Sequence, residues 1–140
     1  MIINKWTKWI PLDGLSKKYS LESIVDNEGL VNIVLIDIAD DKKKLHIDFH
    51  NPRVFSYKKT DLRFKKHTLN ELDKIYGSTF TNEWTFFKIN NSSYVQELMK
   101  KSYEIFGIDI SLHIIFLTTD TLLEVIPYEE PTFTFIENER

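Results

Sequence analysis

A two-residue alternation of apolar and polar side chains through the middle of the chain most strongly limits its fold. The segment from Leu45 to His50 reads Leu-His-Ile-Asp-Phe-His, and an extended backbone places every second one of these side chains on the same face. The segment from Leu30 to Ala39 is apolar on both faces, which is typical of a central strand. A polar turn separates the two segments, so we expect them to pair as antiparallel strands.

Similar patterns in the rest of the chain predict further strands and two short helices. The other expected strands are residues 19–26, 53–59, 84–89, 108–116, 122–126 and 132–136. Thr68 and Ser93 begin the spacings Thr-x-x-Glu and Ser-x-x-Gln, which are typical of a capping box at the start of a helix. Gly77 and Gly107 are placed to end these helices. Because the helices do not alternate strictly with the strands, we expect an α+β fold: a mainly antiparallel sheet of five to seven strands with two short helices packed on one face.

Each expected helix carries apolar residues at intervals of three and four positions, which predicts a buried stripe. In the first helix the stripe is Leu69, Leu72, Ile75 and Tyr76. In the second helix it is Val95, Leu98, Met99, Ser102, Ile105 and Phe106. Both helices are therefore expected to pack against the sheet through these stripes.

The size and composition of the chain indicate one domain. Its 140 residues fit a single core, so we expect the domain to span residues 1–140. Hydrophobic residues make up 42% and charged residues 28%, which argues against disorder. Because cysteine is absent, a disulfide scaffold, a thiolate zinc site and a cysteine nucleophile are excluded.

No segment has the character of a membrane span or of a secretion signal. The apolar runs fall well short of the roughly 20 residues that cross a bilayer. Near the N-terminus, Asn4, Lys5 and Lys8 interrupt the apolar residues, so the uninterrupted apolar core of a signal peptide is absent. We therefore expect a cytoplasmic protein without a membrane partner.

Charge is distributed unevenly along the chain. Residues 42–67 contain nine Lys or Arg against two Asp, a net of +7, so the rest of the chain carries -10 within the total of -3. From residue 120 onward, six acidic residues oppose Arg140 alone. Such asymmetry is a hint about partners, and its simplest interpretation is two oppositely charged surface patches on one sheet.

Histidine and carboxylate side chains on one strand face form a candidate metal site. His46, Asp48 and His50 share the polar face of their segment, and imidazole with carboxylate suits zinc, iron or manganese. Side chains two apart on a strand lie about 7 Å apart, so their heads converge where the strand is twisted or bulged. His113 is a candidate fourth group. This pattern defines, as an alternative function, a small metal-dependent enzyme, although an ordinary solvated strand face has the same pattern.

Other catalytic and cofactor motifs are missing. There is no Gly-x-Ser-x-Gly, and the four glycines are too far apart to form a phosphate-binding loop, so no further cofactor and no catalytic residue is predicted. The basic stretch contains Phe55, Tyr57 and Phe64, a mixture that suits single-stranded nucleic acid. The sequence pI near 5.8 and the acidic C-terminal part argue against that partner.

A non-catalytic protein-binding module is the function class that these observations favour. The candidate partner-binding residues combine an aromatic anchor with charges of both signs: Trp84, Lys58, Lys59, Glu129 and Glu130. Complementary charges speed encounter, and large buried rings supply affinity. Homo-oligomers formed through an edge strand, at residues 132–136 or 53–59, are compatible with this interpretation.

One stretch of the sequence resembles a known group of proteins. It runs from Trp84 to Tyr94 and is followed by His113 in an expected strand, by Glu124-Val125-Ile126 and by Glu130-Pro131. Over about residues 45–131 the chain is similar to a loose group of small uncharacterised proteins of Gram-positive bacteria, some of which look like immunity partners encoded beside secreted toxins. The resemblance implies the order strand, capped helix, strand and a toxin as the protein partner, and it supplies no catalytic residues.

Overall fold

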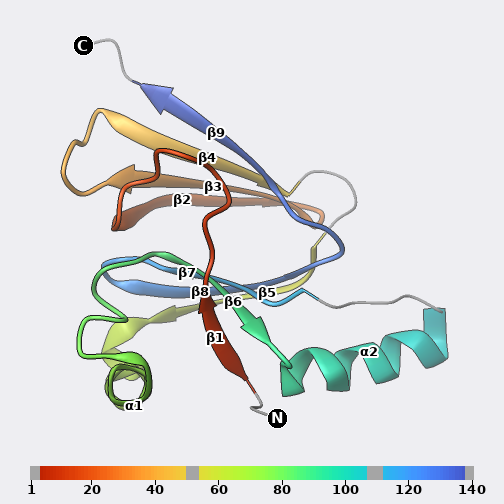
Figure 1. Cartoon of the computed structure of the whole chain (residues 1–140). Coiled ribbons are helices and arrows are strands. Elements are labelled where there is room, and N and C mark those ends of the chain that lie inside the picture. The colour runs from red at the N-terminus through yellow and green to blue at the C-terminus, as the bar shows by residue number, and fades with distance from the viewer. Residues whose placement is uncertain (1–3, 50–53, 107–111, 138–140) are drawn as a thin grey trace.

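The structure has three layers, made of two antiparallel sheets and two helices (Figure 1). The computed structural model describes residues 4–49, 54–106 and 112–137. Within these residues, a sheet of five strands faces a sheet of four strands. Both helices lie against the outer face of the larger sheet, so that sheet forms the middle layer.

Each sheet is antiparallel throughout. The larger sheet has the order β1-β6-β7-β8-β5, and the smaller one has the order β2-β3-β4-β9. The strands of the larger sheet are β1 (Lys5–Lys8), β5 (Val54–Asp61), β6 (Phe86–Asn90), β7 (Ile114–Leu117) and β8 (Thr121–Pro127). Those of the smaller sheet are β2 (Tyr19–Asn27), β3 (Leu30–Asp37), β4 (Lys43–Phe49) and β9 (Thr132–Glu137). The helices are α1 (Lys66–Tyr76) and α2 (Ser93–Phe106), and a 3-10 turn covers Leu62–Phe64.

The expected α+β class is confirmed, whereas the expectation of one sheet with five to seven strands is wrong. The described residues form nine strands in two sheets. A two-residue period shows which side chains share a face, but it does not show which strands belong to the same sheet. Because both helices cover the five-stranded sheet, the apolar face of the other strands is buried by packing sheet on sheet.

The main core lies between the two sheets and is built by the predicted alternation. On β3 and β4 every second side chain is buried: Val31, Ile33, Leu35, Leu45, Ile47 and Phe49. These side chains pack against buried residues of the facing sheet, namely Phe86, Ile114, Phe116, Leu123 and Val125. The predicted antiparallel pairing of β3 with β4 is confirmed by a register that places Val34 opposite His46.

The first helix forms where the sequence predicts it, but it begins earlier. Because α1 starts at Lys66, Thr68 lies inside its first turn, and the side chain of Lys65 at the N-cap position makes no capping hydrogen bond. The helix ends at Gly77, as predicted, where a φ of 128° favours glycine. Ile75 is 68% exposed, so its expected burial is wrong. The apolar stripe is narrower than the sequence spacing predicts.

The second helix is capped one residue before the predicted position. It begins at Ser93, and the residue that caps it is Ser92, whose Oγ accepts the backbone N–H of Val95 at 3.1 Å. Val95 is buried, as predicted, whereas the side chains of residues 102–106 and the expected stop at Gly107 lie outside the described residues. Neither helix, within the part of the chain that the structure describes, is long and apolar enough to cross a membrane.

Candidate functional site

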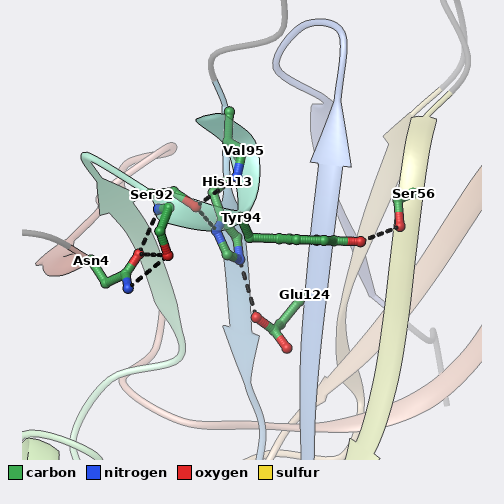
Figure 2. A network of polar contacts seen from close by, with 8 residues as sticks. Asn4, Ser56, Ser92, Tyr94, Val95, His113 and Glu124 are labelled. Carbon is green, nitrogen blue, oxygen red and sulfur yellow. Dashed lines mark hydrogen bonds and ion pairs between the residues drawn. The ribbon is translucent and has the colours of Figure 1, made fainter. Parts of the chain in front are cut away.

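A buried polar cluster lies at the start of α2, on the outer face of the five-stranded sheet (Figure 2). Ser92 Oγ lies 2.8 Å from His113 Nδ1, and His113 Nε2 lies 3.1 Å from a carboxylate oxygen of Glu124. Ser92 and His113 are each 5% exposed. Buried polar groups with these reactive side chains require an explanation, either as a functional site or as a structural element.

Three separate segments of the chain supply the cluster. Ser92 follows β6 in a turn where Asn91 has a φ of 55°, a left-handed conformation that asparagine tolerates. His113 immediately precedes β7. Glu124 lies on the adjacent strand β8, opposite Ile115. The β7–β8 hairpin therefore brings the histidine and the carboxylate together, and the β6–α2 turn adds the serine.

The segment before β1 braces the same turn. The backbone N–H of Asn4 donates to the carbonyl oxygen of Asn91 at 3.0 Å, and Asn4 Oδ1 accepts the N–H of Ser93 at 2.8 Å. Both bonds hold backbone groups that would otherwise lack a partner at the start of the helix. The first turn of α2 is therefore fixed from two sides, by Asn4 before β1 and by His113 before β7.

The hydrogen bonds of the cluster connect the helix cap to Glu124 through His113. Ser92 Oγ accepts the N–H of Val95, so its own hydrogen is free to point at His113 Nδ1. A neutral imidazole that accepts at Nδ1 carries its hydrogen on Nε2, and from there it donates to Glu124. The cluster is thus a continuous chain of donors and acceptors from the helix backbone to a carboxylate.

Glu124 is kept ionised by its neighbours. The hydrogen bond from His113 is the main reason why the pKa of Glu124 lies below its ordinary value, and burial of the carboxylate opposes this effect in part. The ammonium groups of Lys65 and Lys58 lower the pKa further. This part of the outer face therefore holds positive charges around a half-buried carboxylate.

The cluster contains the residue types of a hydrolytic serine triad, but its geometry does not suit nucleophilic attack. The Ser92 hydroxyl is buried and already accepts a backbone N–H. The neighbouring pocket is lined by neither Ser92 nor His113. A nucleophile needs an accessible oxygen and oriented donors for the developing negative charge. In this arrangement the cluster instead fixes the first turn of α2 to strand β8.

A pocket opens beside the cluster, between α2 and the edge strand β5. It has a volume of about 260 Å³ and is lined by Ser56, Lys58, Tyr94, Glu124 and Ile126. Tyr94 is 45% exposed, and its hydroxyl lies 3.4 Å from Ser56 Oγ (Figure 2). Its ring meets the ring of His113 edge-on, with the two centroids 6.1 Å apart. The pocket therefore combines an exposed, positioned aromatic ring with a lysine on a floor of sheet residues.

The predicted metal residues lie on the opposite side of the molecule. His46 and Asp48 are on the outer face of β4, as predicted, and His50 lies outside the described residues. His46 Nε2 lies 2.8 Å from Asn32 Oδ1 on the neighbouring strand. Among the residues that the structure describes, no three His, Asp or Glu side chains come together in a way that could hold a metal ion.

His113 does not lie beside His46 and Asp48. Its ring contacts Ser92 and Glu124 on the outer face of the five-stranded sheet, whereas His46 lies on the outer face of the four-stranded sheet. The apolar core between the sheets separates the two histidines. The expected role of His113 as a fourth group beside His46 is therefore not supported.

Two of the predicted partner-binding residues face solvent on β5, and one of them, Lys58, lines the pocket. Lys58 and Lys59 are exposed on β5, and neither forms an ion pair with any residue in the described ranges. Trp84 lies elsewhere. Its Nε1–H donates to the carbonyl oxygen of Trp9 at 3.0 Å, and its ring packs edge-on against Phe86. Trp84 is therefore partly buried at the margin of the core.

The acidic residues of the C-terminal part are interleaved with basic ones. Glu129 and Glu130 are exposed in the connection from β8 to β9, and Glu130 forms an ion pair with Lys88 of β6. On β8, Glu124 lies directly opposite Lys58 of β5. The expected arrangement of two oppositely charged patches on one sheet is therefore wrong, because antiparallel pairing places acidic and basic segments side by side.

The sequence contains signals for the cluster, but it does not predict the cluster as a unit. A histidine beside an apolar strand and a serine directly before a helix are visible in the sequence. Their meeting depends on the register of the β7–β8 hairpin and on the pairing of β6 with β7, which joins residues far apart in the chain. Sequence patterns fix faces and turns, and they leave such register largely open.

Comparison with known proteins adds no assignment to this site. No family model and no curated protein matches this sequence, and no solved structure matches this fold. The function is therefore inferred from the geometry and charge of the described residues.

Proposed function

We propose that this chain is a non-catalytic protein-binding module, which binds an acidic surface of a partner protein at the pocket beside α2. The observation that carries the proposal is the meeting of an exposed tyrosine ring with Lys58, which forms no ion pair among the described residues. The adjacent cluster of Ser92, His113 and Glu124 is occupied by internal hydrogen bonds, which favours binding over catalysis on this face.

The pocket has the features of a binding hot spot. Tyr94 presents a large amphipathic ring, and its contacts with Ser56 and His113 hold that ring in place. Lys58 lines the pocket, so an approaching carboxylate meets its ammonium group there, whereas Lys59, the next residue of the same edge strand, adds positive charge on the other face of that strand. Such charges speed the encounter with an acidic partner and select against basic ones.

We further propose that the partner is a toxin, that the protein is of the immunity type and that it acts in the cytoplasm. The sequence resemblance to a loose group of small proteins of Gram-positive bacteria, some of which look like immunity partners, supports this form of the proposal. Neutralisation by binding needs a rigid complementary surface and no catalytic group. Here the pocket floor consists of Glu124 and Ile126 on a central strand, so little conformational freedom is lost when a partner binds.

The test is capture of the partner by the purified chain, with the neighbouring gene products of the native host co-expressed. Lys58→Glu with Lys59→Glu is compared with Lys42→Glu with Lys43→Glu, an exposed adjacent pair at the other sheet that gives the same charge change. We expect stoichiometric binding to wild type, a loss of about tenfold or more in affinity for the first double variant, and a change within about twofold for the second.

A second variant tests the aromatic anchor and the biological role. Tyr94→Ala is expected to weaken the same complex by about 2 kcal/mol, as measured by isothermal titration calorimetry. Cells that express the captured partner should grow only when the wild-type chain is present. If no stoichiometric partner is captured, or if both lysine double variants lose affinity equally, the proposal fails.

A further inference from the structure

The edges of the two sheets differ in their protection against pairing with another strand. β1 has only four residues, with a lysine at each end, and β2 has an irregular register between Leu21 and Ser23. β5 carries Lys58 and Lys59. Short length, irregularity and lysines are devices that keep sheet edges apart. β9 has none of them, because it reads Thr-Phe-Thr-Phe-Ile before its final Glu137.

The free side of β9 is also exposed and apolar. Phe135 is 46% exposed and Ile136 is 39% exposed, although both are large hydrophobic residues. In its sheet, β9 pairs with β4 on one side. Among the described residues, no backbone hydrogen bond from outside the sheets reaches Thr132–Glu137 on the other side. An added strand therefore meets open backbone groups and apolar surface together.

We propose that β9 pairs with β9 of a second copy of this chain, in an antiparallel register centred on Thr134. This register places Phe133 opposite Phe135, and Thr132 opposite Ile136. Aromatic pairs and pairs of β-branched residues are favourable across neighbouring strands. The two four-stranded sheets then form one continuous sheet across the dimer.

The strand is complementary to itself, and for this reason a second copy is the occupant. From Thr132 to Ile136 it carries no charge, so two copies oppose no like charges, and Glu137 falls opposite Pro131. Phe133 and Phe135 lie on the same face as the inward-facing Ile47 and Leu45 of β4, so pairing extends the apolar inner layer of each copy. Because one strand pair buries a small area, the association is weak, with a dissociation constant in the micromolar range.

The test places a charge on the two-fold axis of the proposed dimer. Thr134 is exposed, so Thr134→Lys and Thr134→Glu leave the fold of the monomer intact. Sedimentation velocity from micromolar to millimolar protein is expected to show a monomer–dimer equilibrium for wild type and a dissociation constant about tenfold higher for each variant alone. An equimolar mixture of the two variants is expected to regain wild-type association, because lysine then faces glutamate.

Control variants separate this dimer from nonspecific association and from partner binding. Thr79→Lys adds the same charge at an exposed threonine between α1 and β6, and it should leave the dissociation constant unchanged. The double variant Lys58→Glu with Lys59→Glu should also dimerise as wild type does. A wild-type chain that stays monomeric over the whole range overturns the proposal. So does a Thr134→Lys chain that dimerises normally, or a mixture that does not recover.

Discussion

The two helices lie on the same face of the same sheet, yet they are attached to it by different interactions. α1 packs on an apolar cluster whose buried members are Leu72, Phe80, Phe87, Ile89, Ile115, Leu117 and Leu122. α2 is attached at its first turn by the polar chain from Ser92 through His113 to Glu124. Its apolar contact in the described residues is smaller and centres on Val95 and Ile126.

This difference shows how one sheet face meets two structural requirements. Apolar packing supplies free energy in proportion to the buried area and has no preferred direction. Hydrogen bonds contribute about 1 kcal/mol each, but they fix distances and angles narrowly. The polar attachment therefore gives α2 a defined position in addition to a modest gain in stability. Tyr94 lies in the turn of α2 that is fixed in this way, and it forms one wall of the proposed binding pocket.

The largest expected effect tests whether α1 is held by apolar packing. Phe87 is fully buried, and its ring lies 5.0 Å from that of Phe80. Phe87→Ala should lower the free energy of unfolding by about 3–5 kcal/mol in urea denaturation, because it removes contact area and leaves a cavity. Ile75→Ala, at the exposed position of the same helix, should change it by less than about 0.5 kcal/mol. Equal effects of the two substitutions would break the comparison.

A smaller loss is expected when the polar attachment of α2 is cut. His113→Leu leaves the Glu124 carboxylate and the Ser92 hydroxyl without their partner, and it should cost about 2–3 kcal/mol of unfolding free energy. The double variant His113→Leu with Glu124→Leu should recover part of that loss, because no unpaired carboxylate remains. Chemical denaturation of both variants measures the difference. Additive losses would show that the two residues are not coupled.

The helix caps offer a finer test. Ser92→Ala removes the acceptor for the Val95 N–H and should cost about 1 kcal/mol. Thr68→Ala is the matched change in α1, where the threonine lies inside the helix and is exposed, so a change within about 0.5 kcal/mol is expected. Thermal unfolding followed by circular dichroism is suitable for both. A larger effect at Thr68 would mean that α1 is capped by its side chain after all.

The smallest effect depends on pH. In the folded protein the pKa of Glu124 lies below its ordinary value of 4.5, chiefly because of the hydrogen bond from His113. The ionised carboxylate therefore adds stability above the unfolded-state pKa, and that contribution is lost as the pH falls through the lower, folded-state pKa. The stability difference between wild type and Glu124→Gln should be constant near neutral pH and shrink below about pH 4.5. A difference that grows on acidification would contradict this account.

Local features of the fold could be predicted from the sequence, and long-range ones could not. The alternation from Leu45 to Phe49 correctly predicts which side chains of β4 are buried, because neighbouring residues set the face of a strand. Gly77 correctly predicts the end of α1. The division into two sheets depends on how distant strands assemble, and the two-residue period is the same in either case.

The candidate site shows the same limit at the level of single side chains. The sequence indicates a helix near Ser93, yet Ser92 is the cap, because the β6–α2 turn and the bond to Asn4 determine where the helix begins. His113 is visible as a histidine beside an apolar strand, but its partner Glu124 is defined by the register of β7 with β8. Solvent-facing charges such as Lys58 are easier to anticipate, since exposure follows directly from polarity.

The strand order of the larger sheet has a consequence for how the chain folds during its synthesis. β1 and β5 come early in the sequence, but the strands between them, β6, β7 and β8, come later. Lys5 pairs with Asn90, and Tyr57 pairs with Val125. On the ribosome, β1 therefore waits without a partner until β6 has left the exit tunnel, and β5 waits until β8 has left it. The sheet is thus completed only once β8 is available, and its distant pairings make its formation slow compared with helix formation.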